Sequence, residues 1–134
     1  LAFGCNRVNL RRDNFVEVLQ SSNILLCMAG TATEQAVGLG KPVVQLPGNG
    51  PQFTPKFAEA QRRLLGPTVF CAEGNSGSRS NLQATAYLIE SIFNVLKQDK
   101  KLNQECEFQG AIRLGKKGGT KSIVDFINKS IHHL

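Results

Sequence analysis

The sequence predicts an α/β protein: a partial, three-layer Rossmann-like domain with a small parallel sheet of three to four strands flanked by helices, and a helical C-terminal half. Three observations support this prediction. Short apolar runs alternate with helix-like segments in the first half, the connections between the runs are helical, and the second half carries only helical patterns. Strands joined by short helical crossovers lie parallel in one sheet, because such crossovers return right-handed to the same sheet.

The N-terminal part of the chain predicts a helix followed by a strand. Asp13 is placed to cap a short helix, whose apolar face runs over residues 15–19. Residues 23–29 form a continuous apolar run of strand length, as expected for a parallel strand that is covered on both faces. A weaker strand pattern lies around residues 1–8, and a strand there would raise the number of strands in the sheet from three to four.

The middle of the chain alternates helices and strands. Thr31 and Glu34 match a capping box, which predicts a helix that begins at Thr31. Thr54 and Pro55 supply the N-cap and the N1 proline of the next helix. The remaining strand candidates are residues 42–46 and residues 68–72, and the helix between them ends at Gly66-Pro67.

The C-terminal half predicts helices alone. Ser80 and Gln83 repeat the capping-box signature, and helical spacing of apolar residues continues to Lys97. Two further helices are predicted at residues 101–114 and 120–132, with a turn rich in glycine and lysine between them. The last helix carries an apolar stripe formed by Ile123, Ile127 and Ile131.

The composition fits one soluble domain. Its 134 residues, 41% of them hydrophobic, are enough to bury about two-thirds of the unfolded surface in a single core. The four cysteines form no Cys-x-x-Cys pair, so we expect neither a metal site nor a disulfide framework. This cysteine usage predicts a reducing cytoplasm as the location. The sequence has no apolar run of about 20 residues and no signal-peptide pattern, as expected for a soluble protein. Because the sequence begins with Leu rather than Met, we expect a piece of a longer protein.

The charge balance favours anionic partners. Sixteen Lys and Arg residues against ten Asp and Glu residues give a net charge of +6, which suits phosphates or acidic lipid. The densest clusters, at residues 97–101 and 115–121, are typical of solvated surface. The chain has one Tyr, no Trp and no interleaving of basic and aromatic residues, so nucleic acid is not an expected partner. Peripheral contact with a membrane is an expectation for the full-length protein.

Two polar turns follow neighbouring strand candidates. Gly30 and Thr31 come directly after the strand at 23–29, and a loop rich in Gly and Pro follows the strand at 42–46. Ligands of open α/β sheets bind beyond the carboxyl ends of the strands, so we expect these turns to be two sides of one cleft. The free amides and the dipole of a helix N-terminus favour a phosphate there, and the hydroxyls of Thr31 and Thr33 can donate to its oxygens.

No catalytic residue can be assigned from the sequence. The Gly-Lys pair within residues 38–42 lacks the further glycine and the Ser or Thr of a Walker motif. His132 and His133 lie at the extreme C-terminus, where solvated side chains are expected, and no Cys-His or Ser-His-Asp grouping follows from the spacing. The sequence therefore predicts ligand binding without catalysis by this chain, and no cofactor.

A family resemblance adds a ligand class. Residues 24–66, ILLCMAGTATEQAVGLGKPVVQLPGNGPQFTPKFAEAQRRLLG, resemble the second half of the nucleotide-sugar-binding domain of GT-B glycosyltransferases, and the nearest likeness is to lipid A disaccharide synthase-related proteins. The terminal RLGKKGGTKSIVDFI is similar to the closing glycine-rich turn and helix of that family, so the resemblance covers roughly residues 23–131. Sugar-nucleotide epimerases of the same fold share the segment.

The resemblance implies a binding site for a uridine diphosphate (UDP) sugar. The turn beside the diphosphate would be formed by Ala29, Gly30 and Thr31, and the loop near the sugar by Gly48, Asn49, Gly50 and Gln52. The family glutamate that holds the ribose hydroxyls falls on Gln35, while Glu34 lies one position earlier. An amide bonds a diol more weakly than a carboxylate does. Glu34 and Gln35 are therefore both candidates for contact with the ribose, and the simpler interpretation of Glu34 is that it only caps the helix.

The resemblance also implies that a second domain is missing. A GT-B enzyme closes two Rossmann-like domains over its substrates, and the N-terminal acceptor domain has no counterpart in residues 1–134. The expected function is donor binding by one Rossmann-like domain, the C-terminal part of a two-domain protein, with no activity alone. The alternatives are part of a UDP-sugar 2-epimerase, and a non-enzymatic module that binds anions or membranes.

Overall fold

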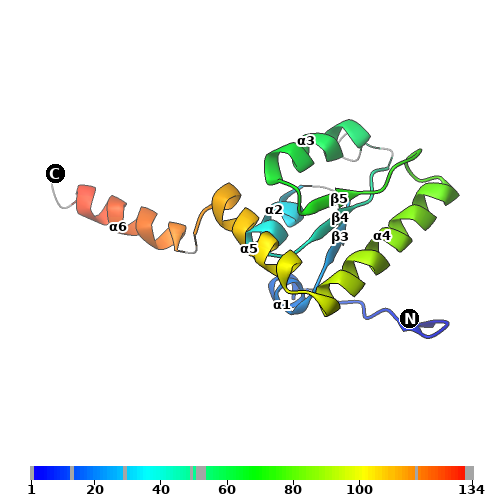
Figure 1. Cartoon of the computed structure of the whole chain (residues 1–134). Coiled ribbons are helices and arrows are strands. Elements are labelled where there is room, and N and C mark those ends of the chain that lie inside the picture. The colour runs from blue at the N-terminus through cyan, green and yellow to red at the C-terminus, as the bar shows by residue number, and fades with distance from the viewer. Residues whose placement is uncertain are drawn as a thin grey trace.

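The computed structural model describes residues 2–12, 14–28, 30–48, 50, 54–116 and 118–131, and it confirms the predicted α/β class (Figure 1). Parallel strands in the first half of the chain are flanked by helices, and the second half is helical. The elements in chain order are β1 (Ala2–Phe3), β2 (Asn6–Arg7), α1 (Phe15–Ser21), β3 (Leu25–Cys27), α2 (Thr31–Gly38), β4 (Val43–Gln45), α3 (Pro55–Leu65), β5 (Val69–Cys71), α4 (Arg79–Gln98), α5 (Lys101–Leu114) and α6 (Gly119–Ile131).

The main sheet has the strand order β3-β4-β5, and both neighbouring pairs are parallel. Its register aligns Leu25 with Val43 and Val43 with Val69. The crossovers through α2 and α3 run in the same direction along the sheet, so right-handed connections place these two helices on one face. α4 packs from the other face against β4, which gives the three layers that the sequence predicts (Figure 1).

The core lies between the sheet and the helices on its α2 side. All three residues of β4 are buried, as expected for a central parallel strand. α5 packs so closely against α2 that a Cβ atom at Gly110 would collide with the carbonyl oxygen of Val37. The buried apolar cluster consists of Leu19, Ala36, Val37, Val43, Leu65 and Val69.

The predicted starts of α2, at Thr31, and of α3 are confirmed, whereas the capping boxes predicted for α2 and α4 are wrong. The Thr54 hydroxyl accepts a hydrogen bond from the Phe57 amide at 3.2 Å, with Pro55 as the first helical residue. The capping box expected at the start of α2 does not form, because Gly30 occupies the N-cap position and no side chain caps the helix. The N-cap of α4 is Ser78, two residues before the predicted cap Ser80, and the helix begins at Arg79.

The N-terminal strand prediction is also corrected. β1 and β2 pair antiparallel as a separate two-stranded hairpin and add no fourth strand to the parallel sheet. Asp13, the cap expected for α1, lies outside the described residues, and Asn14 occupies the N-cap position without a side-chain capping bond. The predicted helix at 101–114 is confirmed as α5, and α6 covers the described part of the one predicted at 120–132.

Candidate functional site

The structure brings the two polar turns together at the carboxyl edge of the sheet. β3 and β4 end in register, with Cys27 opposite Gln45, and the Leu46 amide donates a hydrogen bond of 2.9 Å to the Cys27 carbonyl. In the loop that follows β4, a Cβ atom at Gly48 would lie 3.7 Å from the Met28 Cε atom. The segment after β3 and the segment after β4 therefore contact each other, as the strand order requires.

A pair of glutamine side chains holds the turn between β3 and α2. The Gly30 amide donates to Gln61 Oε1 at 3.3 Å, and Gln61 Nε2 donates back to the Gly30 carbonyl at 3.3 Å. Gln45 Nε2 donates to the same Gln61 Oε1 at 2.7 Å. Gln45 is fully buried and Gln61 is 7% exposed, so water competes little for these bonds. We call this arrangement of Gly30, Gln45 and Gln61 the glutamine clamp.

Sequence reasoning missed both glutamines of the clamp. Gln45 stands in the apolar segment PVVQL, and Gln61 shares the inward side of α3 with Ala58 and Leu65. A polar residue on a buried face needs a hydrogen-bonding partner, because an unpaired buried amide is costly. A glutamine in an apolar strand or on the inward side of a helix therefore indicates a buried hydrogen bond. Only the fold shows that Gln61 bonds the turn at Gly30 and that Gln45 donates to Gln61.

The two threonines in the first turn of α2 have different surroundings. Thr31 is exposed, while Thr33 is fully buried and its hydroxyl lies 3.0 Å from Cys27 Sγ. The phosphate-donor role expected for Thr33 does not fit this position, because its hydroxyl faces the core. Burial raises the pKa of the Cys27 thiol, and the Thr33 hydrogen bond only partly offsets that rise. Cys27 is therefore a neutral, structural partner of Thr33 near pH 7.

Two backbone amides at the start of α2 come before the first amide that donates a hydrogen bond within the turn. The Thr33 amide donates to the Gly30 carbonyl at 3.0 Å, so the amides of Thr31 and Ala32 precede it. Gly30 adopts φ +85°, a conformation that few residues other than glycine accept. A side chain at this position would strain the backbone that the clamp holds.

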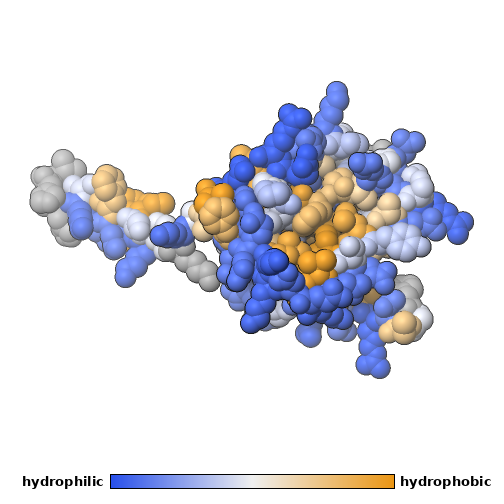
Figure 2. Space-filling model, in the orientation of Figure 1, coloured by the Kyte–Doolittle hydropathy of each residue, from blue (hydrophilic) through white to orange (hydrophobic). Residues whose placement is uncertain are grey.

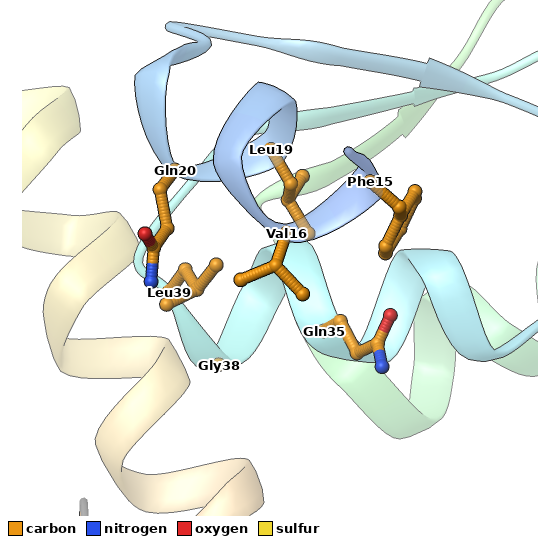
Figure 3. Close-up of a pocket in the computed structure, with 7 residues that line it drawn as sticks. All are labelled: Phe15, Val16, Leu19, Gln20, Gln35, Gly38 and Leu39. Atoms are coloured by element: carbon orange, nitrogen blue, oxygen red, sulfur yellow. The ribbon is translucent and has the colours of Figure 1, made fainter. Parts of the chain in front are cut away.

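Gln35 lies on the outer side of α2, one helical turn beyond Thr31. It is exposed and stands at the mouth of a hollow of about 300 Å³ between α1 and α2 (Figure 3). Phe15 lies over the same end of this hollow as Gln35. Glu34 is half-buried and makes no capping bond, so its simpler interpretation as half of a capping box is wrong. The hollow is lined by Phe15, Val16, Leu19, Gln20, Gln35, Gly38 and Leu39.

The sugar-side candidates are only partly described. Gly48 and Gly50 are half-buried, whereas Ala29, Asn49 and Gln52 lie outside the described residues. Across the described ranges, no group of three or more His, Cys, Asp or Glu side chains could hold a metal ion. Likewise, no helix in those ranges has both the length and the apolar character needed to cross a membrane.

A third helix start lies at the same edge of the sheet, after β5. The Ser78 hydroxyl accepts a hydrogen bond from the Asn81 amide at 3.2 Å and caps α4. Asn81 Nδ2 donates to the carbonyls of Ala72 and Glu73, at 3.3 Å and 3.1 Å, and so fixes the segment that leaves β5. The positive ends of the dipoles of α2, α3 and α4 therefore all lie at the carboxyl side of the sheet, which favours an anion there.

Comparisons of the chain with protein-family models, curated proteins and solved structures found no match. The class of protein is given by the fold: an α/β domain with an open, three-stranded parallel sheet and helices on its faces. A function must therefore be argued from the geometry of the residues in this chain.

Proposed function

We propose that this chain is the donor-binding part of a glycosyltransferase and that its ligand is a UDP-sugar. The observation that carries the proposal is the glutamine clamp, which fixes the turn before α2 at the carboxyl edge of the sheet. A buried polar network that fixes one backbone turn preorganises the amides next to it. In open α/β folds, ligands bind at this edge.

In this proposal the diphosphate binds at the start of α2. The amides of Thr31 and Ala32 and the exposed Thr31 hydroxyl supply hydrogen-bond donors, and the helix dipole adds a partial positive charge. Gly30 has no side chain to block the approach of phosphate oxygens. Thr33 acts from inside, through its bond to Cys27, and supports the helix start without touching the ligand.

The nucleoside extends from there along the outer side of α2. Thr31 and Gln35 lie one turn apart on that side, so a diphosphate at Thr31 places a ribose within reach of Gln35. The hollow beyond Gln35 has apolar walls and a volume at the lower end of the range for ligand pockets. The ring of Phe15, beside Gln35 in Figure 3, offers a flat surface for a base. The sugar would lie toward Gly48 and Gly50.

The proposal assigns binding, and not catalysis, to this chain. A nucleotide held at one open edge remains in contact with water, whereas glycosyl transfer needs a closed site. The acceptor and the catalytic base would come from another domain. A UDP-sugar epimerase would use the same donor site. The product that the complete protein forms from a UDP-sugar distinguishes a glycosyltransferase from an epimerase.

An NMR titration tests the proposed ligand and its position. The ¹⁵N-labelled chain is titrated with UDP, ADP, GDP and inorganic diphosphate at constant ionic strength. UDP should shift the amides of residues 30–35, 48 and 50 before those of α6, and at lower concentration than the other three ligands. Equal responses to all four ligands, or shifts that follow the lysine and arginine residues over the whole surface, would replace the proposal with general anion binding.

A further inference from the structure

β5 forms one edge of the parallel sheet, because in the described chain it pairs with β4 alone. The Val43 amide donates a hydrogen bond of 3.0 Å to the Thr68 carbonyl. In a parallel strand the amide and the carbonyl of one residue point to the same side, and the side alternates along the strand. Thr68 and Phe70 therefore face β4 with their backbone groups, whereas Val69 and Cys71 face away from the sheet.

Most of these outward backbone groups have no partner. The Val69 amide donates to the Gly66 carbonyl at 3.3 Å, within the turn that precedes β5. The Val69 carbonyl and both backbone groups of Cys71 form no hydrogen bond within the part of the chain that the structure describes. A row of unpaired amides and carbonyls at a sheet edge is a template for a further strand.

An apolar hollow lies beside this edge. It has a volume of about 530 Å³ and is bordered by α3, β5 and α4, so the two helices that flank β5 leave the edge open between them. Figure 2 shows apolar atoms gathered between α3 and α4. The volume lies within the range of ligand pockets and is sufficient for a large side chain. The apolar part of the lining consists of Pro67, Val69, Phe70, Ala72 and Leu88.

The charged groups at the rim of the hollow are not balanced. The Glu59 carboxylate accepts hydrogen bonds of 2.8 Å from both Arg62 and Arg63, so its charge is compensated. Glu73 is exposed, and its carboxylate forms no ion pair with any described residue. Asn81 Nδ2 donates to the Glu73 carbonyl at 3.1 Å, which fixes the backbone of this residue just beyond β5. The rim therefore presents one uncompensated carboxylate, which favours a cation on a partner.

We propose that the β5 edge binds an extended peptide segment of another protein. The segment adds to the sheet as a fourth strand, places an aliphatic or aromatic side chain in the hollow and sets a Lys or Arg beside Glu73. Strand addition of this kind gains affinity from main-chain hydrogen bonds and specificity from a pocket for alternate side chains. A small molecule in the hollow would leave the outward groups of Val69 and Cys71 unpaired, so a peptide accounts for more of the surface.

Selection from a phage-displayed library of random nine-residue peptides on the full chain tests the proposal. The enriched peptides should share an aliphatic or aromatic residue and a Lys or Arg. Fluorescence polarisation then measures the affinity of the synthetic, labelled peptide. Cys71→Pro should weaken binding at least about tenfold, because it removes the outward amide but no bond to β4, and proline is tolerated on such an edge. Cys71→Ala keeps the amide and is the matched control.

Two further variants test the hollow and its rim. Leu88→Lys places a charge in the apolar lining and should weaken binding at least as strongly as Cys71→Pro. Glu73→Lys should weaken binding by about three- to tenfold, and this loss should decrease at high salt because the group is exposed. Glu90→Lys makes the same change of charge at an exposed position of α4 outside the hollow, and it should leave the affinity unchanged.

Hydrogen exchange shows whether the peptide pairs as a strand. The bound peptide should slow exchange of the Cys71 amide, because this amide becomes a donor to the peptide. N-methylation of the peptide at alternate residues should abolish binding in one of the two alternate sets only, and this measurement does not depend on the folding of any variant. Failure to enrich a peptide, binding that survives Cys71→Pro, or unchanged exchange at Cys71 would overturn the proposal. A dimer of the unchanged chain that Cys71→Pro dissociates would assign the edge to a second copy instead.

Discussion

Among single residues, Thr31 and Thr33 show how one helix turn can hold an exposed hydroxyl and a buried one. Both were candidate phosphate donors in the sequence, yet Thr31 is exposed and Thr33 is buried against Cys27. The difference arises from the 3.6-residue period, which turns Thr33 toward the core together with Ala36 and Val37. Because Gly30 is the N-cap, Thr31 also has no capping role in stability.

Replacing Thr31 by Ala should therefore weaken nucleotide binding and leave stability nearly unchanged. Loss of one hydroxyl bond to a charged phosphate costs about 1.5 kcal/mol, which is roughly a tenfold weaker affinity. Isothermal titration with UDP and thermal melts of the same samples measure both effects. Thr120→Ala, in α6, is the control and should alter neither. A clear fall in melting temperature for Thr31→Ala would show that this threonine supports the helix.

The glutamine clamp makes a prediction about stability. Gln61→Leu leaves the Gly30 amide and carbonyl and the buried Gln45 amide without their partner, so unfolding free energy should fall by about 2–3 kcal/mol. Adding Gln45→Leu removes one of the unpaired groups, and the double variant should be more stable than the sum of the single losses. Urea unfolding of the four proteins in this double-mutant cycle gives the coupling energy. Strict additivity would mean that the two side chains act independently.

At the scale of elements, the contact between α2 and α5 depends on one small residue. A Cβ atom at Gly110 would meet the Val37 carbonyl oxygen, which belongs to backbone and cannot swing aside. Gly110→Ala should destabilise the fold by about 1–3 kcal/mol through overpacking, although alanine is the better helix former. Gly119→Ala is the matched control, because no atom lies within 4 Å of a Cβ at that position. Chemical denaturation of both variants should show a loss for Gly110→Ala only.

The exposed side of α3 carries a charge cluster with a defined pH dependence. Glu59 accepts hydrogen bonds from Arg62 and Arg63, which lower its pKa from 4.5 to about 2. A carboxylate whose pKa is lower in the folded protein stabilises the fold above pH 4.5 and loses that contribution as the pH falls toward 2. Thermal melts from pH 6 to pH 2.5 should therefore fall less steeply for Glu59→Gln than for the unchanged chain. The effect is small and decreases with salt, because all three side chains are largely solvated.

The sequence predicted elements better than their ends and partners. The period of apolar residues located the helices and the three parallel strands, since burial on one or both faces leaves a strong pattern. Capping was predicted less well, because Thr31-x-x-Glu34 and Ser80-x-x-Gln83 fit the same pattern that a helix interior can show. The clamp joins residues 31 positions apart, and no local pattern contains that pairing.

For the molecule as a whole, the open edge of the sheet limits what the chain can do alone. Three helix starts and two adjoining turns meet there, and the proposed nucleotide site lies on one surface without a lid or a facing domain in the described chain. Binding energy from one side can hold a ligand, but a developing oxocarbenium charge in contact with water gains less stabilisation than in a closed site. Under the proposed function, donor binding by this chain should therefore be separable from glycosyl transfer.

The isolated chain should bind UDP and release no sugar from UDP-glucose or UDP-N-acetylglucosamine. The reason is that the proposed function gives this chain the binding of the donor and assigns the acid and the base of glycosyl transfer to another domain. Incubation with each radiolabelled UDP-sugar, followed by chromatography of the free sugar and UDP, measures hydrolysis directly. Ligand binding in the same preparation is confirmed by the rise in melting temperature with UDP concentration, since a ligand that binds only the folded state stabilises it by mass action. UDP release above the rate of a heat-denatured sample would show that this chain holds its own catalytic groups, and the acceptor domain would then serve for selectivity alone.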